Sequence, residues 1–377
     1  MNHISERNLD KITELRHVLH RCPELSLQES GTIGILKEFL QKNTTLETED
    51  RDGWFYAVKC STESPAASSP IAFRADMDAL PMDESIALPY GSARSGISHK
   101  CGHDGHMAAL CGLALELDKM KVSRDIYLIF QPAEEIGLGA VRCAELIREK
   151  GITEIYAFHN LSGYPENSIV YRQNLTQPAS EGLLVRLHGK QSHASAPEEG
   201  CNPSAAIAEL ALYAQHLPED VHEGMALCTI VGMQCGQGDF GISAGEGSVC
   251  VTLRAEQEPF MKEMEKKILQ KAEELSVRDS LKAEYEIHDY FPETRNHEEA
   301  VSRIIRKAAQ LQLPVVEMKK LWRASEDFGH YLKLCPGAMF YIGNGEEYPA
   351  VHTESYDFND RILKTAVNLF LALAESE

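Results

Sequence analysis

The sequence lacks long apolar runs and any excess of basic residues. None of its hydrophobic stretches approaches the roughly 18 apolar residues that a membrane-spanning helix needs. The first residues are polar, without the apolar segment of a secretory signal. Lysine and arginine number 37 against 57 aspartate and glutamate residues, a formal net charge of −20 that repels nucleic acid and anionic membrane surfaces. These absences favour a cytoplasmic protein that acts on small molecules, with no nucleic-acid or membrane partner.

Paired cysteine motifs are also missing. The chain has ten cysteines, but no two of them form a Cys-x-x-Cys motif. Several lie inside apolar stretches, among them Cys228 and Cys250. Without a secretory signal, the expected state is a reduced, buried thiol that packs as a small hydrophobic side chain. Cys101 is the exception, because it lies in a histidine-rich loop.

With 377 residues, the chain is long enough for two domains. Short β-rich apolar runs alternate with segments of helical spacing over most of its length. This alternation predicts an α/β domain with a mostly parallel central sheet. The apolar runs begin at Ile71, Ile126, Ile155 and Met339, and the helical segments lie near residues 6–20, 30–42, 104–120, 139–150, 297–312 and 359–375.

The middle of the chain follows a different pattern. Residues 181–188 and 248–254 partly alternate between apolar and polar positions, as strands with one exposed face do. Helical stretches near 203–216 and 258–276 accompany them. The pattern predicts a smaller α+β domain inserted into the α/β domain. The expected division is residues 1–179 with 292–377 for the α/β domain and residues 180–291 for the insertion.

Side chains that can bind metal ions follow the apolar runs directly. In open α/β sheets, ligands gather beyond the carboxyl ends of the strands. Each group alone has an ordinary explanation, such as a strand cap, a solvated acid pair or a core histidine. Their common place at one sheet edge instead predicts a shared site. The groups are Asp76 and Asp78, Glu134 and Glu135, His159, the late His352, and the loop residues His99, Cys101, His103, Asp104 and His106.

The chemistry of this set suits two divalent cations. Imidazole and thiolate favour zinc-like ions, whereas carboxylates also accept manganese or cobalt. Five or more candidate ligands exceed the needs of one tetrahedral ion and indicate two. Of the adjacent Glu134 and Glu135, one can bind metal while the other moves a proton from a water molecule to a leaving amine. His193, in a loop shaped by glycine and proline, could donate to a developing oxyanion, with a surface turn as the alternative.

Five motifs, together with His352, closely resemble one known family. They resemble the amidohydrolase branch of the dinuclear metallopeptidases, which includes aminoacylase, hippurate hydrolase and the hydrolases of auxin (indole-acetyl-amino acid) conjugates. The resemblance implies a zinc-exopeptidase-like catalytic domain with an inserted lid and dimerisation domain. The motifs are RADMDALP at 74–81, HKCGHDGH at 99–106, QPAEE at 131–135, SHASAP at 192–197 and SEDF at 325–328.

The resemblance also implies a role for each matching residue. Glu134 matches the general base, and His193 matches a residue that in relatives reaches the active site of the partner subunit. Asp78, Asp104 and His106 are expected to support the ligands without binding metal themselves. Two divalent ions per subunit (zinc, manganese, cobalt or nickel) and a homodimer or higher homo-oligomer follow from the same resemblance. The residues that match metal ligands are Cys101, His103, Glu135, His159 and His352.

Three segments depart from the family pattern. Residues 241–244 (Gly-Ile-Ser-Ala) stand where the family has Asn-Val-Ile-Pro, and Ser-His-Lys at 98–100 replaces Met-His-Ala. Thr353 and Glu354 follow His352 in place of a Ser-Pro-like pair. None of these changes removes a metal ligand or the base. They bear on substrate choice more than on chemistry.

The sequence therefore predicts metal-dependent hydrolysis of the amide bond of N-acyl amino acids or related small conjugates. In this hypothesis a metal-bridging hydroxide is the nucleophile and Glu134 is its general base. One alternative on the same scaffold is a dipeptidase or aminopeptidase-like metallopeptidase acting on peptides. The other is a metal-dependent binding protein without turnover, against which the intact Glu134 argues.

Overall fold

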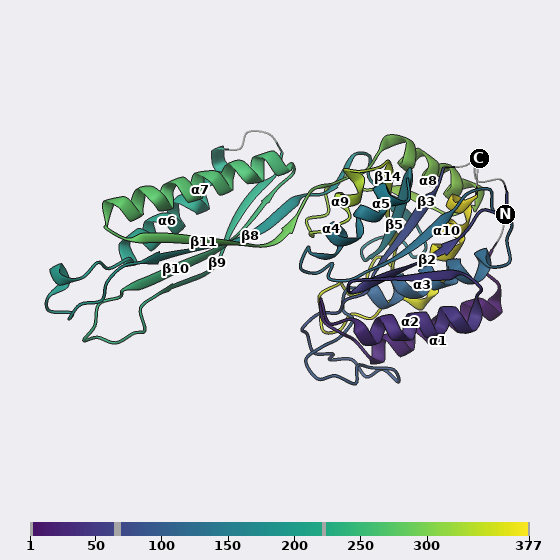
Figure 1. Cartoon of the computed structure of the whole chain (residues 1–377), viewed down its shortest axis with the longest axis horizontal. Helices are drawn as coiled ribbons and strands as arrows, with labels where there is room; N and C mark the ends of the chain where they lie inside the picture. The colour runs from purple at the N-terminus through teal and green to yellow at the C-terminus, as the bar shows by residue number, and fades with distance from the viewer. Residues whose placement is uncertain (1–2, 64–68, 221–223, 376–377) are drawn as a thin grey trace. The chain divides into compact units, whose positions relative to one another are not determined.

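The computed structural model describes residues 3–63, 69–220 and 224–375 (Figure 1). The chain divides into two compact units, termed here the larger and the smaller unit. Each has its own sheet and its own hydrophobic core. The larger unit comprises Met1–Thr176, Thr294–Leu321 and Glu326–Glu377, and the smaller unit comprises Gln177–Glu293 and Trp322–Ser325.

An eight-stranded sheet forms the centre of the larger unit, in the order β1-β2-β4-β3-β5-β14-β6-β13. Strands β4, β3, β5 and β14 run parallel, whereas β1 pairs antiparallel with β2, β2 with β4, and β6 with β14. This confirms the expected α/β class with a large, mostly parallel sheet. The strands are β1 (Glu47–Arg51), β2 (Trp54–Lys59), β3 (Ile71–Asp76), β4 (Ile126–Gln131), β5 (Glu154–Leu161), β6 (Ile169–Tyr171), β13 (Val315–Glu317) and β14 (Gly337–Gly343).

Helices cover both faces of this sheet. Alternate residues of β3 show the two sides: Phe73 packs in the core formed with α1, α3, α8 and α10, and Ala72 in the core formed with α4, α5 and α9. Burial on both faces explains why the central strands contain short apolar runs in the sequence. Full burial of one such phenylalanine contributes about 1.5–3 kcal/mol. The helices are α1 (Glu6–Arg21), α2 (Ser30–Asn43), α3 (His103–Leu117), α4 (Gly139–Cys143), α5 (Glu145–Glu149), α8 (Glu298–Gln310), α9 (Gly329–Leu332) and α10 (Leu363–Ala374).

Helix α3 is almost completely buried. All of its residues except Glu116 are buried, which requires side chains that are apolar or internally paired all round the helix. Helices α1 and α10 pack against it. Its first residue is His103, so the buried end of α3 places a histidine next to the loop that carries Cys101. The helix expected over residues 139–150 is instead two short helices, α4 and α5, which meet at Ala144.

The smaller unit has a four-stranded antiparallel sheet in the order β11-β8-β10-β9. Helices α6 (Ser204–His216) and α7 (Glu258–Arg278) lie along one face of it (Figure 1). In β10 the side chains of Val249, Val251 and Leu253 are buried beneath these helices, and the residues between them are partly exposed. The strands are β8 (Ala179–His188), β9 (Ala226–Cys235), β10 (Glu246–Ala255) and β11 (Lys282–Phe291); β7 (Leu175–Gln177) and β12 (Thr294–Arg295) form a separate pair.

The cysteines differ in part from the expectation. All ten are free, as expected, but only Cys101, Cys111, Cys143 and Cys335 are buried. The prediction that most of them would be buried is therefore wrong. Cys250 is partly exposed because it lies on the face of the sheet that α6 and α7 leave uncovered, and Cys228 is partly exposed because it lies on the edge strand β9. Among the described residues, no helix has the length and apolar character that crossing a bilayer requires.

Candidate metal centre

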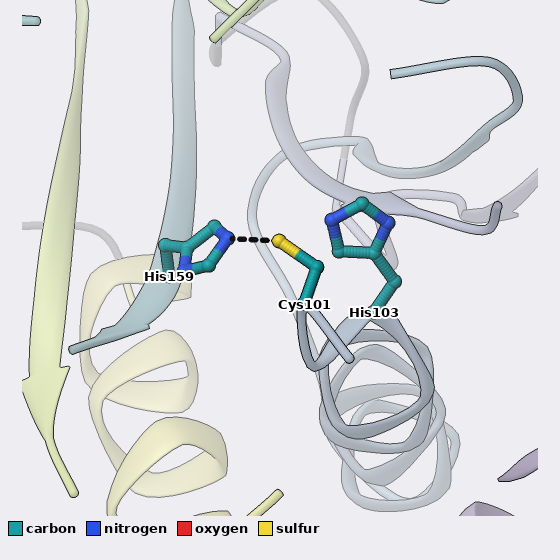
Figure 2. Close-up of side chains that lie close together, drawn as sticks. All are labelled: Cys101, His103 and His159. Atoms are coloured by element: carbon teal, nitrogen blue, oxygen red, sulfur yellow. Dashed lines mark hydrogen bonds between the residues drawn. The ribbon is translucent and has the colours of Figure 1, made fainter. Parts of the chain in front are cut away.

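Strand ends and the start of one helix bring the predicted metal ligands together in the larger unit. Glu134 and Glu135 follow the end of β4, and His159 lies near the end of the parallel strand β5. Cys101 lies in the loop before α3, and His103 is the first residue of that helix. Figure 2 shows the Cys101 thiol pointing toward the His159 ring, with His103 beside it. The carboxyl ends of parallel strands thus form the edge on which the site is built.

Cys101 is at the centre of the site. Its Sγ lies 3.3 Å from His159 Nε2 and 3.3 Å from His352 Nε2. Glu135 Oε2 lies 3.5 Å from His352 Nε2, and Glu135 Oε1 lies 3.7 Å from His103 Nε2. The donor atoms form two sets that share the sulfur, with all atoms of a set within 4.8 Å of one another. We term Cys101, His103 and His159 the first donor group, and Cys101, Glu135 and His352 the second donor group.

The imidazoles of the first donor group are oriented by main-chain oxygens. His103 Nδ1 lies 2.9 Å from the carbonyl oxygen of Asp78, and His159 Nδ1 lies 2.8 Å from that of Asn160. Because a carbonyl oxygen only accepts, Nδ1 carries the proton when each ring is neutral, which leaves the lone pair of Nε2 available to a metal ion. Hydrogen bonds of this kind fix the ring and the tautomer of a metal-binding histidine.

Two buried donor atoms lack a hydrogen-bond partner among the described residues. His103 Nε2 and Glu135 Oε1 make no hydrogen bond to any of the described residues. Buried polar atoms in folded proteins are nearly always paired, so unpaired atoms in both donor groups indicate a missing ligand. One thiolate, three imidazoles and one carboxylate are donors that zinc and similar divalent cations accept. The residues present therefore fit two divalent cations with a shared sulfur.

The charges of the site also favour a bound cation. Burial would lower the pKa of His103, but Asp76 and the neighbouring carboxylates raise it to about 10. Burial and the nearby glutamates raise the pKa of the Cys101 thiol well above its usual range. Burial lowers the pKa of His159, which keeps its imidazole neutral as a metal ligand requires. The pocket thus carries surplus negative charge that a divalent cation would neutralise.

Glu134 lies beside the first donor group. Its Oε2 is 3.9 Å from His103 Nε2, and its side chain is almost completely buried. Burial, reinforced by Glu326 and Glu135, raises the pKa of Glu134 well above its usual range. Such a carboxyl group can hold a proton close to neutral pH, which a general acid and base must do.

The turn after β4 aims the two glutamates. Ala133 adopts a left-handed conformation with φ of 51°, which is uncommon for a residue other than glycine. Its N–H donates to Glu29 Oε1 at 2.8 Å, and the N–H of Glu135 donates to Asp78 Oδ2 at 2.9 Å. A left-handed residue of this kind persists only where its surroundings hold it. Glu29 and Asp78 therefore help to place Glu134 and Glu135.

Gly102 separates Cys101 from His103 and must be a glycine. Its φ is 102°, and a Cβ at this position would lie 2.2 Å from Asn160 Oδ1. Asn160 donates from Nδ2 to the carbonyl oxygen of Cys101 at 3.1 Å. Sequence reasoning missed Asn160, although its place directly after His159 at a strand end is a signal that could have found it.

Three residues predicted to support the ligands have different surroundings. Asp78 contacts His103 Nδ1, as described above. His106 uses both ring nitrogens, with Nδ1 2.6 Å from Asp76 Oδ1 and Nε2 2.8 Å from Asn160 Oδ1. Neither nitrogen is free for a metal ion. Asp76, which was not among the predicted supporting residues, is fully buried and fixes this ring.

Asp104 belongs to a separate ionic cluster. Its Oδ2 lies 2.8 Å from His20 Nδ1 and 3.4 Å from Arg16 Nη1. Both partners come from α1, and the three side chains are buried. Asp104 thus ties the start of α3 to α1, and it affects His103 only through the backbone of that helix.

His193 belongs to the smaller unit, whereas the two donor groups belong to the larger one. It is exposed in the loop after β8. Its Nδ1 lies 3.1 Å from the main-chain nitrogen of Ser195 and 2.7 Å from the Ser195 hydroxyl. Because the main-chain N–H donates to Nδ1, the ring proton of neutral His193 lies on Nε2, which can donate to another group.

Comparison with known proteins gives the family. Residues 72–376 match the profile of Peptidase family M20/M25/M40. The chain is 30% identical to N-acetyl-L-cysteine deacetylase of Bacillus subtilis, over 98% of this chain and 89% of that protein. It is also 30% identical to thermostable carboxypeptidase 1 of Saccharolobus solfataricus, over 94% and 92% of the two chains. This protein belongs to the M20/M25/M40 peptidase family.

A solved structure agrees on the fold. A Bacillus subtilis protein described as a dinuclear metal-binding peptidase of family M20 matches with a TM-score of 0.82 at 24% identity, and 98% of each chain is covered. The family profile and the 30% identical relatives confirm the resemblance inferred from the sequence motifs. They also confirm the expected enzyme class, at the level of a family of amide-bond hydrolases.

Proposed function

We propose that this protein hydrolyses the amide bond of N-acyl amino acids or related small conjugates, at a site that holds two divalent cations. The sharing of the Cys101 sulfur by two donor groups, with the buried Glu134 beside them, is the observation that carries the proposal. The similarity to a deacetylase of N-acetyl-L-cysteine supports the choice of substrate class.

Each donor group would hold one cation. Cys101, His103 and His159 would hold the first, and Cys101, Glu135 and His352 would hold the second. Zinc, manganese, cobalt or nickel suits this mixture of sulfur, nitrogen and oxygen donors. When bound, the two cations supply a Lewis acid for the amide carbonyl and lower the pKa of a water molecule.

Glu134 would act as the general base and then as the general acid. It accepts a proton from the attacking water molecule and delivers that proton to the leaving amine. The raised pKa of its buried carboxyl group suits both steps. Asp78 and the main-chain oxygen of Asn160 keep the imidazoles of His103 and His159 in place during these steps.

The smaller unit would complete the site as a lid and dimerisation domain. In this proposal, Nε2 of His193 donates a hydrogen bond to the oxyanion that develops on the carbonyl group, reaching it from the partner subunit of a homodimer. Mixing a Glu134 variant with a His193 variant should then restore activity in heterodimers. We also propose a cytoplasmic location, which fits the net charge of −20.

A second candidate function is carboxypeptidase activity on peptides. The 30% identity to a thermostable carboxypeptidase favours it. Rates measured in parallel on N-acetyl amino acids, N-benzoyl amino acids and dipeptides with a free amine separate the two candidates. The proposal expects the acylated substrates to have the higher kcat/KM. Tight binding of all three substrates without product release would instead favour a binding protein.

The Glu134→Gln variant tests the assignment of the base. Glutamine keeps the size of the side chain but cannot accept the proton, so kcat should fall by about 100-fold to 10,000-fold. The variant should still bind two cations, which metal analysis of the same sample checks. The matched variant is Glu135→Gln in the adjacent position, which should lose activity together with one cation. Near-wild-type turnover by metal-loaded Glu134→Gln would refute the assignment.

A further inference from the structure

Lys100 is a buried charged residue that the proposed chemistry does not use. It precedes Cys101 directly, and its side chain has no exposed surface. Its ammonium group pairs with Glu84, and Nζ donates to the main-chain oxygen of Tyr356 at 2.7 Å. The main-chain oxygen of Lys100 in turn accepts from the N–H of His352 at 2.7 Å. Lys100 therefore contacts the segment that carries His352 at two points, four residues apart.

The segment that contains His352 is held by individual contacts, among them the hydrogen bond from Asn160 Nδ2 to the Tyr356 hydroxyl at 2.7 Å. It lies between β14 and α10, outside any strand or helix. His352 has a φ of 60°, and about half of its side chain is exposed. A left-handed residue other than glycine costs about 1–3 kcal/mol and needs surrounding contacts to persist. Thr353 and Glu354 follow it, so no proline restricts the backbone here.

Glu84, which pairs with the ammonium group of Lys100, is itself held by hydrogen bonds. Its Oε1 lies 2.9 Å from His20 Nε2, and its Oε2 accepts from the N–H of Ser92 at 3.0 Å. The next residue, Ser85, donates from its N–H to the main-chain oxygen of Glu354 at 3.1 Å. A buried ammonium group is costly unless it is paired and hydrogen-bonded, so these partners specify where Lys100 lies. The connection between β3 and α3, the segment that carries His352 and helix α1 are thereby tied together.

We propose that Lys100 is a positioning residue that holds His352 in the second donor group. The side chain of Lys100 restrains the segment four residues after His352, through its hydrogen bond to the Tyr356 carbonyl. The main-chain carbonyl of Lys100 restrains His352 itself, by accepting from its N–H. The two imidazoles of the first donor group do not depend on this contact, because His103 and His159 are fixed by main-chain oxygens elsewhere. The inference rests on the proposed function only in that the donor groups bind cations.

Titration of metal-free protein with Zn²⁺, followed by calorimetry and metal analysis, tests this role. Lys100→Met keeps the length of the side chain and removes its donors. The second ion should bind about 10-fold to 100-fold more weakly, as is typical when a residue behind a ligand is lost. Affinity for the first ion should stay within about twofold of wild type, because the hydrogen bonds that orient His103 and His159 are untouched.

A cycle with His352→Ala separates positioning from a general effect on the fold. If Lys100 acts through His352, then Lys100→Met adds nothing further to the loss caused by His352→Ala. Lys364→Met, which removes an exposed lysine paired with Glu6, is the matched control and should bind both ions normally. Lys100→Gln, too short to reach both partners, replaces Lys100→Met if that variant does not fold.

The outcomes are distinguishable. Unchanged affinity for the second ion, or equal weakening of both ions, would overturn the role of Lys100. Wild-type protein that binds fewer than two ions would instead contradict the proposed function, and the inference would fall with it. Selective loss of the second ion supports both.

Discussion

The two donor groups share one sulfur atom but are supported in different ways. In the first group, His103 and His159 are buried and lie on α3 and β5. In the second, Glu135 and His352 lie in turns, and about half of the His352 side chain is exposed. Two non-glycine residues with a left-handed backbone lie at the second group: Ala133 comes two residues before Glu135, and His352 is itself left-handed. A helix and a strand position His103 and His159 of the first group, whereas hydrogen bonds between loops position Glu135 and His352 of the second group.

Removing the shared atom should have the largest effect. Cys101→Ala takes a ligand from both groups, so metal analysis should find neither ion retained after gel filtration. Cys111→Ala is the matched control, because Cys111 is equally buried in α3 but lies outside both groups. Retention of two ions by Cys101→Ala would show that the sulfur does not join the groups.

Removing one histidine from each group should separate them. His159→Ala should weaken the first ion selectively, and His352→Ala the second, each leaving one ion bound per chain. The metal-free His159→Ala protein should also lose about 1–3 kcal/mol of unfolding free energy, because the buried carbonyl oxygen of Asn160 loses its donor. Metal-free His352→Ala should change by less than about 0.5 kcal/mol, since its ring is half exposed. Identical losses from the two variants would remove the distinction.

The smallest effect concerns the ionic cluster behind Lys100. Burial would lower the pKa of His20, but Asp104 and Glu84 raise it to about 9. A raised pKa stabilises the fold fully below the unfolded value near 6.5, and this stabilisation is lost as the pH rises through about 9. His20→Gln does not titrate, so the difference in unfolding free energy between metal-free wild type and variant should shrink by about 1–3 kcal/mol over that interval. Denaturant titrations at pH 6.5 and 9.5 measure it. A difference that stays constant with pH would contradict the account.

Both the fold and the site could be predicted where the sequence carries a local signal. Strands β3, β4, β5 and β14 are buried on both faces, so each contains a short apolar run. Strands β9 and β11 were missed because they are edge strands of a sheet with one open face. Most of their side chains are partly or fully exposed, which leaves only a weak pattern. The predicted burial of Cys250 failed because it lies on the open face, and that of Cys228 failed because it lies on the edge strand β9.

In the site, the ligand motifs are short and local, but their supports are not. The proximity of Cys101 and His103 can be inferred from the sequence, because only Gly102 separates them. The contact between Lys100 and Tyr356 joins residues 256 positions apart, so no local sequence pattern predicts it. The role of Asn160 likewise depends on a close approach to Gly102 that only the folded chain reveals.

Zinc titration of metal-free wild-type protein tests the central claim most directly. The claim is that Cys101, His103, Glu135, His159 and His352 form one site with two cation positions. The account predicts that two Zn²⁺ ions bind per chain, one of them more tightly, and that both restore amide hydrolysis. A chain that binds one ion or none, while correctly folded, would contradict it.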